Sequence, residues 1–405
     1  MSEHIDLEAR YCAQNYHPLP VVLTRAQGAY VWDEAGKKYL DMMSAYSAVS
    51  HGHGHERLVK LVQQQVQRLS IVSRAFYTDK LGSFLEKACS LTGQDMALPM
   101  NTGAEAVETA IKAARKWAYT VKGVESNRAE IIACKGNFHG RTISIVAMSD
   151  EPQYQYGFGP FPPGFRLVEY GNIDSLEAAI NENTAAFLVE PIQGEGGIIV
   201  PPDGYLKAAE ELCRKNNVLL IADEIQTGLG RTGKLLACEH EQVRPDGLIL
   251  GKALGGGILP VSMFLARRDV MAVFTAGDHG STFGGNPLAA AVGLEALNIL
   301  VEDQLAARSA AMGEYLMGQL GHIDTPLISE IRGRGLFIGV EVNPSLCSAR
   351  TVCEMLMERG LLSKETHETV VRLAPPLIIS ETEIEWAITQ IREVFGELDK
   401  MRLAS

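Results

Sequence analysis

The sequence predicts an α/β fold with a mostly parallel sheet, and two features support this prediction. Short β-branched and apolar runs alternate with longer segments of helical periodicity through the middle of the chain, as in strand–helix–strand units. Glycine is frequent, at 39 of 405 residues, and it clusters where apolar runs end, which is typical of ligand-binding turns in such folds. The length corresponds to roughly two to three domains.

The elements of the central part follow in chain order. A helix is expected over 104–119, before the strands, and shorter helical patterns cover 176–180 and 205–216. The strands are expected at 130–134, 186–189, 218–222, 247–250 and 261–266. Such alternation predicts a buried sheet with helices on both faces.

The two ends of the chain have a different pattern. Residues 28–41 predict a hairpin that turns at 34–36, and residues 333–342 predict a strand. A last helix should run from Ser380 to about residue 403, since Ser380 and Glu383 have the spacing of a capping box. We therefore expect one smaller α+β domain made of residues 1–50 and 296–405, around a large domain of residues 51–295.

Composition narrows the function classes. The net charge of −12 argues against a nucleic-acid or anionic-membrane surface, and no apolar run approaches the ~18 residues that span a bilayer. The acidic N-terminus resembles neither a secretory signal nor a transit peptide. Seven scattered cysteines without a CxxC pair favour a reducing, cytoplasmic location. We expect no metal site, because residues 51–55 (HGHGH) are better explained as a turn before a helix that begins at Glu56.

The first segment with chemical meaning is 101–106 (NTGAEA). Thr102 and Glu105 have capping-box spacing, and Gly103 and Ala104 leave backbone N–H groups open at a helix start, where phosphate binds readily. Taken alone, the segment is better explained as a well-capped helix.

The second and third segments follow apolar strands. Asp223 stands at the end of one strand, where a buried carboxylate needs a partner such as a protonated pyridine nitrogen, a helix cap or a salt bridge. Lys252 follows another strand and precedes a glycine-rich turn, and a confined lysine forms Schiff bases readily, although many strand-end lysines are simply exposed. A phosphate cradle, an acid and a lysine together fit pyridoxal phosphate.

A glycine pattern at 228–233 (GLGRTG) also matches a dinucleotide fingerprint. That fingerprint requires a helix directly after it and an acidic residue about 20 positions further on. Residues 234–238 do not begin a convincing helix, and residues 247–268, which include the required position, contain no Asp or Glu. We therefore reject nicotinamide binding.

Longer motifs carry a resemblance to a known family. Segments 189–197 (VEPIQGEGG), 222–233 (ADEIQTGLGRTG), 250–257 (LGKALGGG) and 279–289 (HGSTFGGNPLA) resemble class III aminotransferases of fold type I, over nearly the whole chain. Segments 15–20 (NYHPLP), 44–49 (SAYSAV), 73–77 (SRAFY) and 371–377 (VRLAPPL) are similar to the ornithine aminotransferase subfamily. Fold type I implies a seven-stranded, mostly parallel sheet between helices in the large domain.

The resemblance implies roles for the cofactor residues. Lys252 would be the catalytic Schiff-base lysine and Asp223 the partner of the pyridine nitrogen. The remaining cofactor contacts would be Phe138 and Ile225 on the two ring faces, Gln226 on the phenolic oxygen, Gly103 and Ala104 on the phosphate, and Thr282 reaching the phosphate from a second subunit. The resemblance thus implies a homodimer with its sites at the interface.

The resemblance also implies the substrates, L-ornithine and 2-oxoglutarate, and a place in arginine or proline metabolism. Glu195 would mask Arg372 for ornithine and release it for 2-oxoglutarate, while Arg141 would hold the distal carboxylate with its bidentate fork. Tyr16 and Tyr46 would contact the α-amino and α-carboxylate end of ornithine, unless they are packing residues.

One position departs from the subfamily. His139 stands where many ornithine enzymes have tryptophan, and acetylornithine aminotransferases often share the FHGRT run of 138–142. The alternatives are therefore a sister enzyme for N-acetylornithine or 4-aminobutyrate, and more remotely an aminomutase. A cofactor-sensing regulator would need an attached DNA-binding segment, for which the sequence gives no indication.

Overall fold

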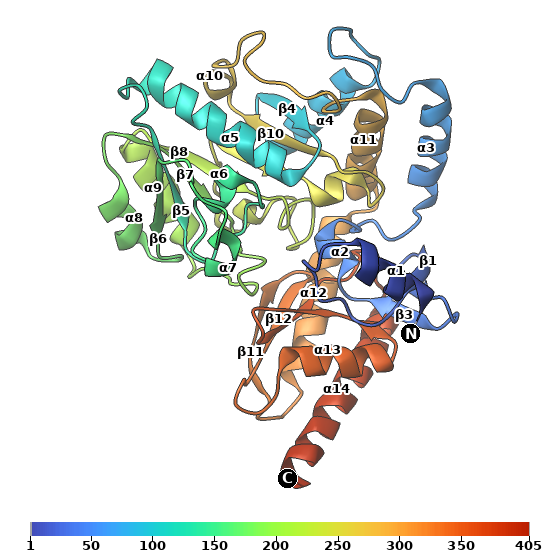
Figure 1. Ribbon diagram of the computed structural model, residues 1–405. Coiled ribbons are helices and arrows are strands. Elements are labelled where there is room, and N and C mark those ends of the chain that lie inside the picture. Colours follow the sequence, from blue (N-terminus) through green and yellow to red (C-terminus); the bar gives the residue numbers. More distant parts are fainter. Residues whose placement is uncertain (1, 405) are drawn as a thin grey trace.

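The computed structural model describes residues 2–404, in which a large sheet and two smaller sheets form separate layers (Figure 1). The strand order of the large sheet is β4–β10–β9–β8–β7–β5–β6. Its strands are β4 Met96–Met100, β5 Glu130–Cys134, β6 Phe165–Val168, β7 Thr184–Val189, β8 Leu219–Asp223, β9 Gly247–Leu250 and β10 Ser262–Ala266. β10 pairs antiparallel with β4 and β9, and the other pairs are parallel. The mostly parallel, seven-stranded sheet is thus confirmed.

Helices cover both faces of this sheet, because successive strand residues point to opposite sides. In β8, Leu219 and Ile221 pack in a core with α5 (Gly103–Trp117), whereas Leu220 and Ala222 pack in a core with α9 (Tyr205–Lys215). This two-sided burial explains why the central strands are continuously apolar. The other helices of residues 44–302 are α2 Ser44–Ser47, α3 Glu56–Arg68, α4 Leu81–Thr92, α6 Ile143–Val146, α7 Pro152–Gln155, α8 Ile173–Ala179, α10 Arg268–Met271 and α11 Pro287–Glu302, with short η1 Ala118–Lys122, η2 Ala237–Glu241 and η3 Lys252–Gly255.

The ends of the chain meet in the smaller sheets. One sheet has the order β1–β2–β3–β13, and the other has the order β11–β12–β15–β14. β3 pairs in parallel with β13, which joins an N-terminal strand to a C-terminal one. The strands are β1 Leu23–Gln27, β2 Tyr30–Asp33, β3 Lys38–Asp41, β11 Ile328–Arg334, β12 Phe337–Val342, β13 Leu361–Leu362, β14 Lys364–Thr366 and β15 Val370–Leu373.

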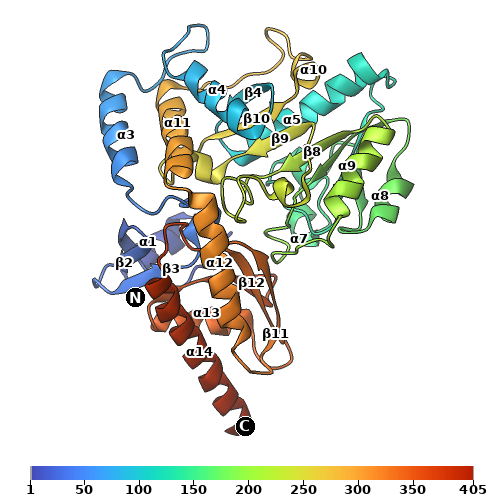
Figure 2. The same ribbon diagram turned by 180° about the vertical axis from the view of Figure 1, so that it is seen from behind.

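Four helices accompany these sheets: α1 Glu3–Tyr11, α12 Leu305–Gly321, α13 Ala349–Glu358 and α14 Glu381–Ala404. α12 and α14 lie side by side in contact (Figure 2). The capping box is present, with the Ser380 hydroxyl accepting from the Glu383 backbone N–H at 3.3 Å. The division at 50/51 and 295/296 stays a prediction, and the second position falls within α11. Among residues 2–404, no helix combines the length and apolarity needed to cross a membrane.

The structure corrects the predicted strands in two ways. Residues 333–342 do not form one strand, because the chain reverses between β11 and β12, where Gly335 has a φ of +55°. A Cβ at Gly335 would lie 2.5 Å from the backbone carbon of Thr232, so packing as well as conformation requires glycine there. The sequence also gave no sign of β4 and β6, the two edge strands; β4 contains Pro99, which weakens any strand pattern.

Candidate active site

The carboxyl ends of β5, β7, β8 and β9 lie next to one another, and ligands bind at this edge in open α/β sheets. Asp223 is the last residue of β8, and the segments that follow β5, β7 and β9 carry Phe138, Glu195 and Lys252. A cavity of about 590 Å³ opens at this edge. It is lined by Asn15, Tyr16, Ala45, Tyr46, Phe138, Arg141, Ile143, Val146, Tyr154, Phe158, Glu195 and Lys252. Six of the residues expected in the site are therefore brought together here.

Lys252 begins a short 3₁₀ turn directly after β9 and Gly251. Its φ of +45° is in the left-handed region, which is uncommon for a residue with a side chain and often marks a functional position. Burial lowers the pKa of the Lys252 amine to about 8; Glu195 and Asp223 oppose this effect, and Arg372 adds to it. About a tenth of the amine is thus neutral, and nucleophilic, at pH 7, far more than for a lysine of ordinary pKa.

Asp223 ends β8 with its carboxylate buried and already partnered. One oxygen accepts from the Ile225 backbone N–H at 3.1 Å, and the other lies 2.7 Å from Nδ1 of His139. Burial alone would lower the pKa of His139, but the hydrogen bond and charge of Asp223 outweigh it and raise that pKa. His139 therefore holds the Asp223 carboxylate in place at the end of β8.

Glu190, the residue directly after β7, lies near His139 and Asp223. Its two oxygens accept backbone N–H groups from Phe138 at 3.0 Å and Gly194 at 3.3 Å. Burial raises the pKa of Glu190 to about 7, with the Asp223 charge acting in the same direction. Glu190 thus connects the loop after β5 to the loop that carries Glu195.

The residues expected to hold pyridoxal phosphate fit that group. Gly103 opens α5 within a complete capping box, and a Cβ there would lie 3.0 Å from Cδ1 of Ile225, so glycine permits the close approach of helix start and ring pocket. Gln226 has a buried amide nitrogen without a hydrogen-bond partner in the described chain, and is free to donate to a bound oxygen. Ala104 contacts the loop of Phe138, since a Cβ at Gly140 would lie 3.1 Å from its methyl group.

Arg372 and Glu195 form an ion pair beside the cavity. Nη1 of Arg372 lies 2.8 Å from Oε1 of Glu195, and its guanidinium lies 5.3 Å from the ring centroid of Tyr46. Arg372 is only 1% exposed, whereas Glu195 and Tyr46 line the cavity. Burial alone would raise the pKa of Glu195, but Arg372 lowers it below its ordinary value. Glu195 therefore stands as an anion between Arg372 and the cavity.

Arg141 also lines the cavity. Its guanidinium lies 3.6 Å from the ring centroid of Tyr154 and 5.3 Å from that of Phe138. Tyr16, in the loop after α1, is 75% exposed and completes the mouth of the cavity.

Thr282 stands apart from these residues. It is exposed, on the loop before α11, and it does not line the cavity of its own chain. Its neighbour Ser281 accepts a hydrogen bond from Asn101 at 2.9 Å, which fixes this loop beside the start of α5.

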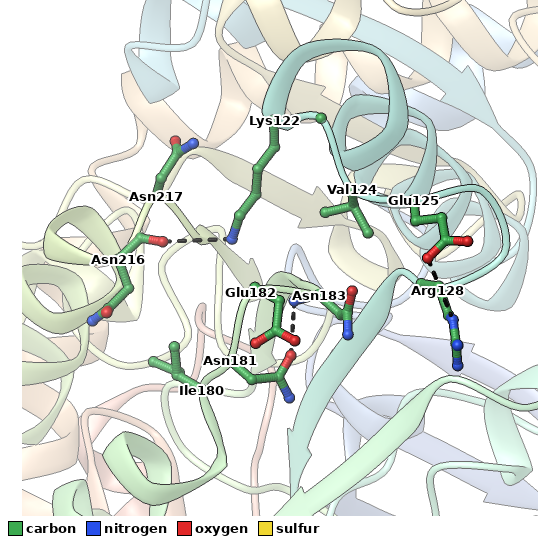
Figure 3. Close-up of a pocket in the computed structure, with 11 residues that line it drawn as sticks. Lys122, Val124, Glu125, Arg128, Ile180, Asn181, Glu182, Asn183, Asn216 and Asn217 are labelled. Carbon is green, nitrogen blue, oxygen red and sulfur yellow. Dashed lines mark hydrogen bonds and ion pairs between the residues drawn. The ribbon is translucent and has the colours of Figure 1, made fainter.

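A larger hollow of about 930 Å³ lies at the opposite edge of the sheet, by the amino ends of β5, β7 and β8 (Figure 3). Lys122 is engaged there, donating to the backbone oxygens of Thr184 at 2.7 Å and Asn216 at 3.5 Å. Arg128 pairs with Glu125. The hollow contains none of the expected site residues, and its two cations are occupied, so the smaller cavity is the candidate site.

Sequence reasoning missed three residues of the site. His139 was noted for its departure from the subfamily and not as a partner of Asp223, although a buried acid requires such a partner. Glu190, in the first of the family motifs, and Tyr154 were not singled out at all. No local signal marks Tyr154, because its contact with Arg141 joins α7 to the loop after β5.

Known proteins resemble this chain closely. The model of the family Aminotransferase class-III matches residues 11–395. Ornithine aminotransferase 2 of Staphylococcus aureus (strain Mu50) is 59% identical over 391 residues, which are 96% of this chain and 98% of that protein. The crystal structure of ornithine aminotransferase from Toxoplasma gondii ME49 has a TM-score of 0.97 at 46% identity, covering 98% of this chain and 95% of that one. Acetylornithine aminotransferase from Elizabethkingia anophelis has a TM-score of 0.88 at 47% identity, covering 97% and 98%. Because the family model matches almost the entire chain, this chain belongs to the class III aminotransferases.

Proposed function

We propose that this enzyme transfers the δ-amino group of L-ornithine to 2-oxoglutarate, with pyridoxal phosphate as its cofactor. The products are L-glutamate and glutamate 5-semialdehyde, which cyclises to pyrroline-5-carboxylate. The observation that carries this proposal is the Arg372–Glu195 pair, which faces the same cavity as Lys252 and Tyr46. The ornithine aminotransferase relatives at 56–59% identity support it.

The residues around the sheet edge would hold the cofactor. We assign the phosphate to the backbone N–H groups of Gly103 and Ala104, the ring nitrogen to Asp223, and the phenolic oxygen to Gln226. The ring would lie between Phe138 and Ile225. When bound, pyridoxal phosphate supplies a ring that draws electron density from the carbon bearing the amine.

Lys252 is the proposed acid–base residue. Its neutral amine takes the proton from Cδ of ornithine in the first half-reaction. In the second half-reaction, the ammonium form returns a proton to the α-carbon of the forming glutamate. Asp223, which is hydrogen-bonded to His139, would accept the hydrogen bond of the protonated ring nitrogen.

Glu195 and Arg372 explain how one site accepts two unlike substrates. Ornithine presents a δ-carbon without a carboxylate, so Glu195 stays on Arg372 and cancels its charge. 2-Oxoglutarate presents a carboxylate next to its reacting carbon, which would replace Glu195 on Arg372 through a bidentate contact. Arg141 would then bind the distal carboxylate, and Tyr16 and Tyr46 would contact the α-carbon end of ornithine.

A spectroscopic experiment tests the function. The visible absorption band of the purified holoenzyme should be bleached by L-ornithine without an acceptor and restored by 2-oxoglutarate, and pyrroline-5-carboxylate should be trapped. The 47% identity with an acetylornithine enzyme and the presence of His139 favour N-acetylornithine as the second candidate. Bleaching by N-acetylornithine or 4-aminobutyrate, but not by ornithine, would overturn the ornithine assignment and leave the cofactor assignment standing.

The charge of Glu195 should control substrate choice. In Glu195→Gln, Arg372 loses its anionic partner, and a buried cation without a partner binds substrate carboxylates more readily. We expect the rate constant with ornithine to fall about tenfold relative to that with glutamate, a change of about 1.4 kcal/mol. Stopped-flow measurement of the two half-reactions checks this. An unchanged ratio of the two rate constants would show that Glu195 does not set the choice.

Cofactor uptake should depend on the pKa of Lys252. The amine must be neutral to attack the cofactor aldehyde, and the neutral fraction rises tenfold per pH unit below the pKa. Because that pKa is lowered to about 8, the rate of pyridoxal phosphate uptake by cofactor-free protein should rise with pH and level off above about 8. A rate that continues to rise toward the ordinary lysine value of 10.5 would contradict the lowered pKa.

We further propose a cytoplasmic homodimer in which Thr282 reaches the partner's phosphate site. Its exposure outside the cavity of its own chain supports this, as do exposed aromatic side chains on the segments around the site. These are Phe76, Tyr77 and Phe283. The seven cysteines are all free, in keeping with a reducing compartment. Sedimentation velocity should give a dimer of the 44.0 kDa chain, and a monomeric active enzyme would refute the shared site.

A further inference from the structure

The two arginines of the site are held in different ways. Arg372 is paired with a carboxylate, Glu195, at 2.8 Å. Arg141 makes no hydrogen bond or ion pair within residues 2–404, and its neighbours are the faces of Tyr154, at 3.6 Å from the ring centroid, and Phe138, at 5.3 Å. Glu195 thus has to move before Arg372 can bind a substrate carboxylate, whereas Arg141 has no carboxylate partner to displace.

We propose that Tyr154 is a positioning residue that holds Arg141 ready for the distal carboxylate of a dicarboxylate substrate, and thereby determines acceptance of dicarboxylates. The inference rests on the proposed function, which assigns that carboxylate to Arg141. An aromatic face attracts a guanidinium through the ring quadrupole and uses none of its N–H donors. A carboxylate in the same place would neutralise the arginine and occupy those donors. Tyr154 therefore orients the cation and leaves its charge available.

Tyr154 is itself fixed in place. It belongs to α7, which begins with Pro152 and is capped by the Glu151 side chain, which accepts from the Gln153 backbone N–H at 3.3 Å. The next residue, Gln155, donates to the backbone oxygens of Val146 and Ser149 at 2.9 and 2.7 Å.

The Tyr154 ring also meets the Phe138 ring edge-to-face, with centroids 6.2 Å apart and planes at 83°. It lines both the 590 Å³ cavity and an adjoining cavity of about 110 Å³ that Glu195 also borders. Arg141 is thus tied, through Tyr154 and Phe138, to the expected position of the cofactor ring. That connection fixes the distance between the guanidinium and the reacting carbon. This distance in turn determines the length of the dicarboxylate that the site accepts.

Binding of glutarate, an unreactive five-carbon dicarboxylate, tests this directly. Calorimetric titration of the holoenzyme should show about tenfold weaker glutarate binding in Tyr154→Leu and Tyr154→Gln, in the range expected for losing a cation–π contact. Tyr154→Phe keeps the ring and should bind glutarate within about twofold of the wild type. In stopped flow, Tyr154→Leu should slow the 2-oxoglutarate half-reaction about tenfold more than the ornithine half-reaction.

Two controls separate the possible failures. Tyr156→Leu removes a neighbouring ring that is 87% exposed and absent from the cavity lining, and it should leave glutarate affinity unchanged. Arg141→Ala should weaken glutarate binding at least as much as Tyr154→Leu. If Arg141→Ala has no effect, the proposed role of Arg141 is wrong. If Arg141→Ala weakens binding and both ring-removing variants bind like the wild type, the role of Tyr154 alone is refuted.

Discussion

Replacing Lys252 with alanine is expected to lower turnover with ornithine by at least about 10³-fold, because one amine serves as both cofactor nucleophile and proton carrier. Lys252 is the one lysine that lines the 590 Å³ cavity. Steady-state turnover and the visible absorption band of the purified variant check this expectation.

The Lys252→Ala experiment needs a control for folding and one for chemistry. Lys234→Ala removes an exposed lysine directly after the 228–233 motif and should retain wild-type turnover. Small primary amines added to Lys252→Ala should restore part of the rate, with an efficiency that follows their basicity, because they replace the missing proton carrier. Near-normal activity in Lys252→Ala, without added amine, would show that another group carries the proton.

Replacing Arg231 with methionine is expected to destabilise the fold by about 3–5 kcal/mol, because several buried acceptors would lose their hydrogen-bond donor. Arg231 is 0% exposed, and burial lowers its pKa to about 9. It donates to the backbone oxygens of Leu336 at 2.9 Å and Pro375 at 2.6 Å. It also donates to the hydroxyls of Ser44 at 3.1 Å and Ser50 at 3.0 Å. The substitution would leave all four acceptors without this donor in the interior.

These bonds also support the substrate site. Ser44 opens α2, in which Ala45 and Tyr46 have left-handed φ values of +47° and +59°, a conformation that costs roughly 1–2 kcal/mol per residue. Arg231 and the Ser44 hydroxyl, which donates to the Ala374 oxygen at 2.6 Å, fix the start of this turn. The Michaelis constant for ornithine should therefore rise in Arg231→Lys, since lysine lacks the planar fork that reaches four acceptors.

Thermal unfolding and steady-state kinetics test the Arg231 prediction. Ser44→Ala removes one of the four acceptors and should cost less, about 1–3 kcal/mol. Arg244→Met changes an exposed arginine and should leave the melting temperature unchanged. A wild-type melting temperature in Arg231→Met would show that the four bonds contribute no net stability, and an unchanged Michaelis constant in Arg231→Lys would separate this network from the substrate site.

Arg231 also explains the glycine pattern at 228–233. The sequence led us to reject dinucleotide binding there, and η2 (Ala237–Glu241) is indeed the next helical element, not a helix directly after the glycines. The sequence could not show the partners of Arg231, the arginine of this pattern. It donates hydrogen bonds to residues 105 and 144 positions later in the chain, and to Ser44 and Ser50 earlier in it. Such a contact leaves no periodicity in the chain.

The sequence by itself determined the central sheet and the chemistry of the cofactor residues. Strands such as β5 and β9 were predicted to the residue, because their apolar runs are short, bounded by polar or glycine residues, and covered on both faces. Asp223 ends β8 and Lys252 follows β9 after one glycine, so parallel pairing alone brings them to one edge. The sequence did not predict the edge strands β4 and β6 or the chain reversal at Gly335. The local sequence patterns there are weak, and contacts with neighbouring elements determine the structure.

The tertiary structure decided which charges are partnered. Arg372 and Glu195 are 177 positions apart, and His139 and Asp223 are 84 apart, yet each pair is in hydrogen-bond contact. The resemblance named the first pair, but their contact, like the aromatic support of Arg141, depends on how loops from different strands meet. Residue type and local spacing specify what a side chain can do. Only the packed molecule specifies whether it is neutralised, buried or left free to bind.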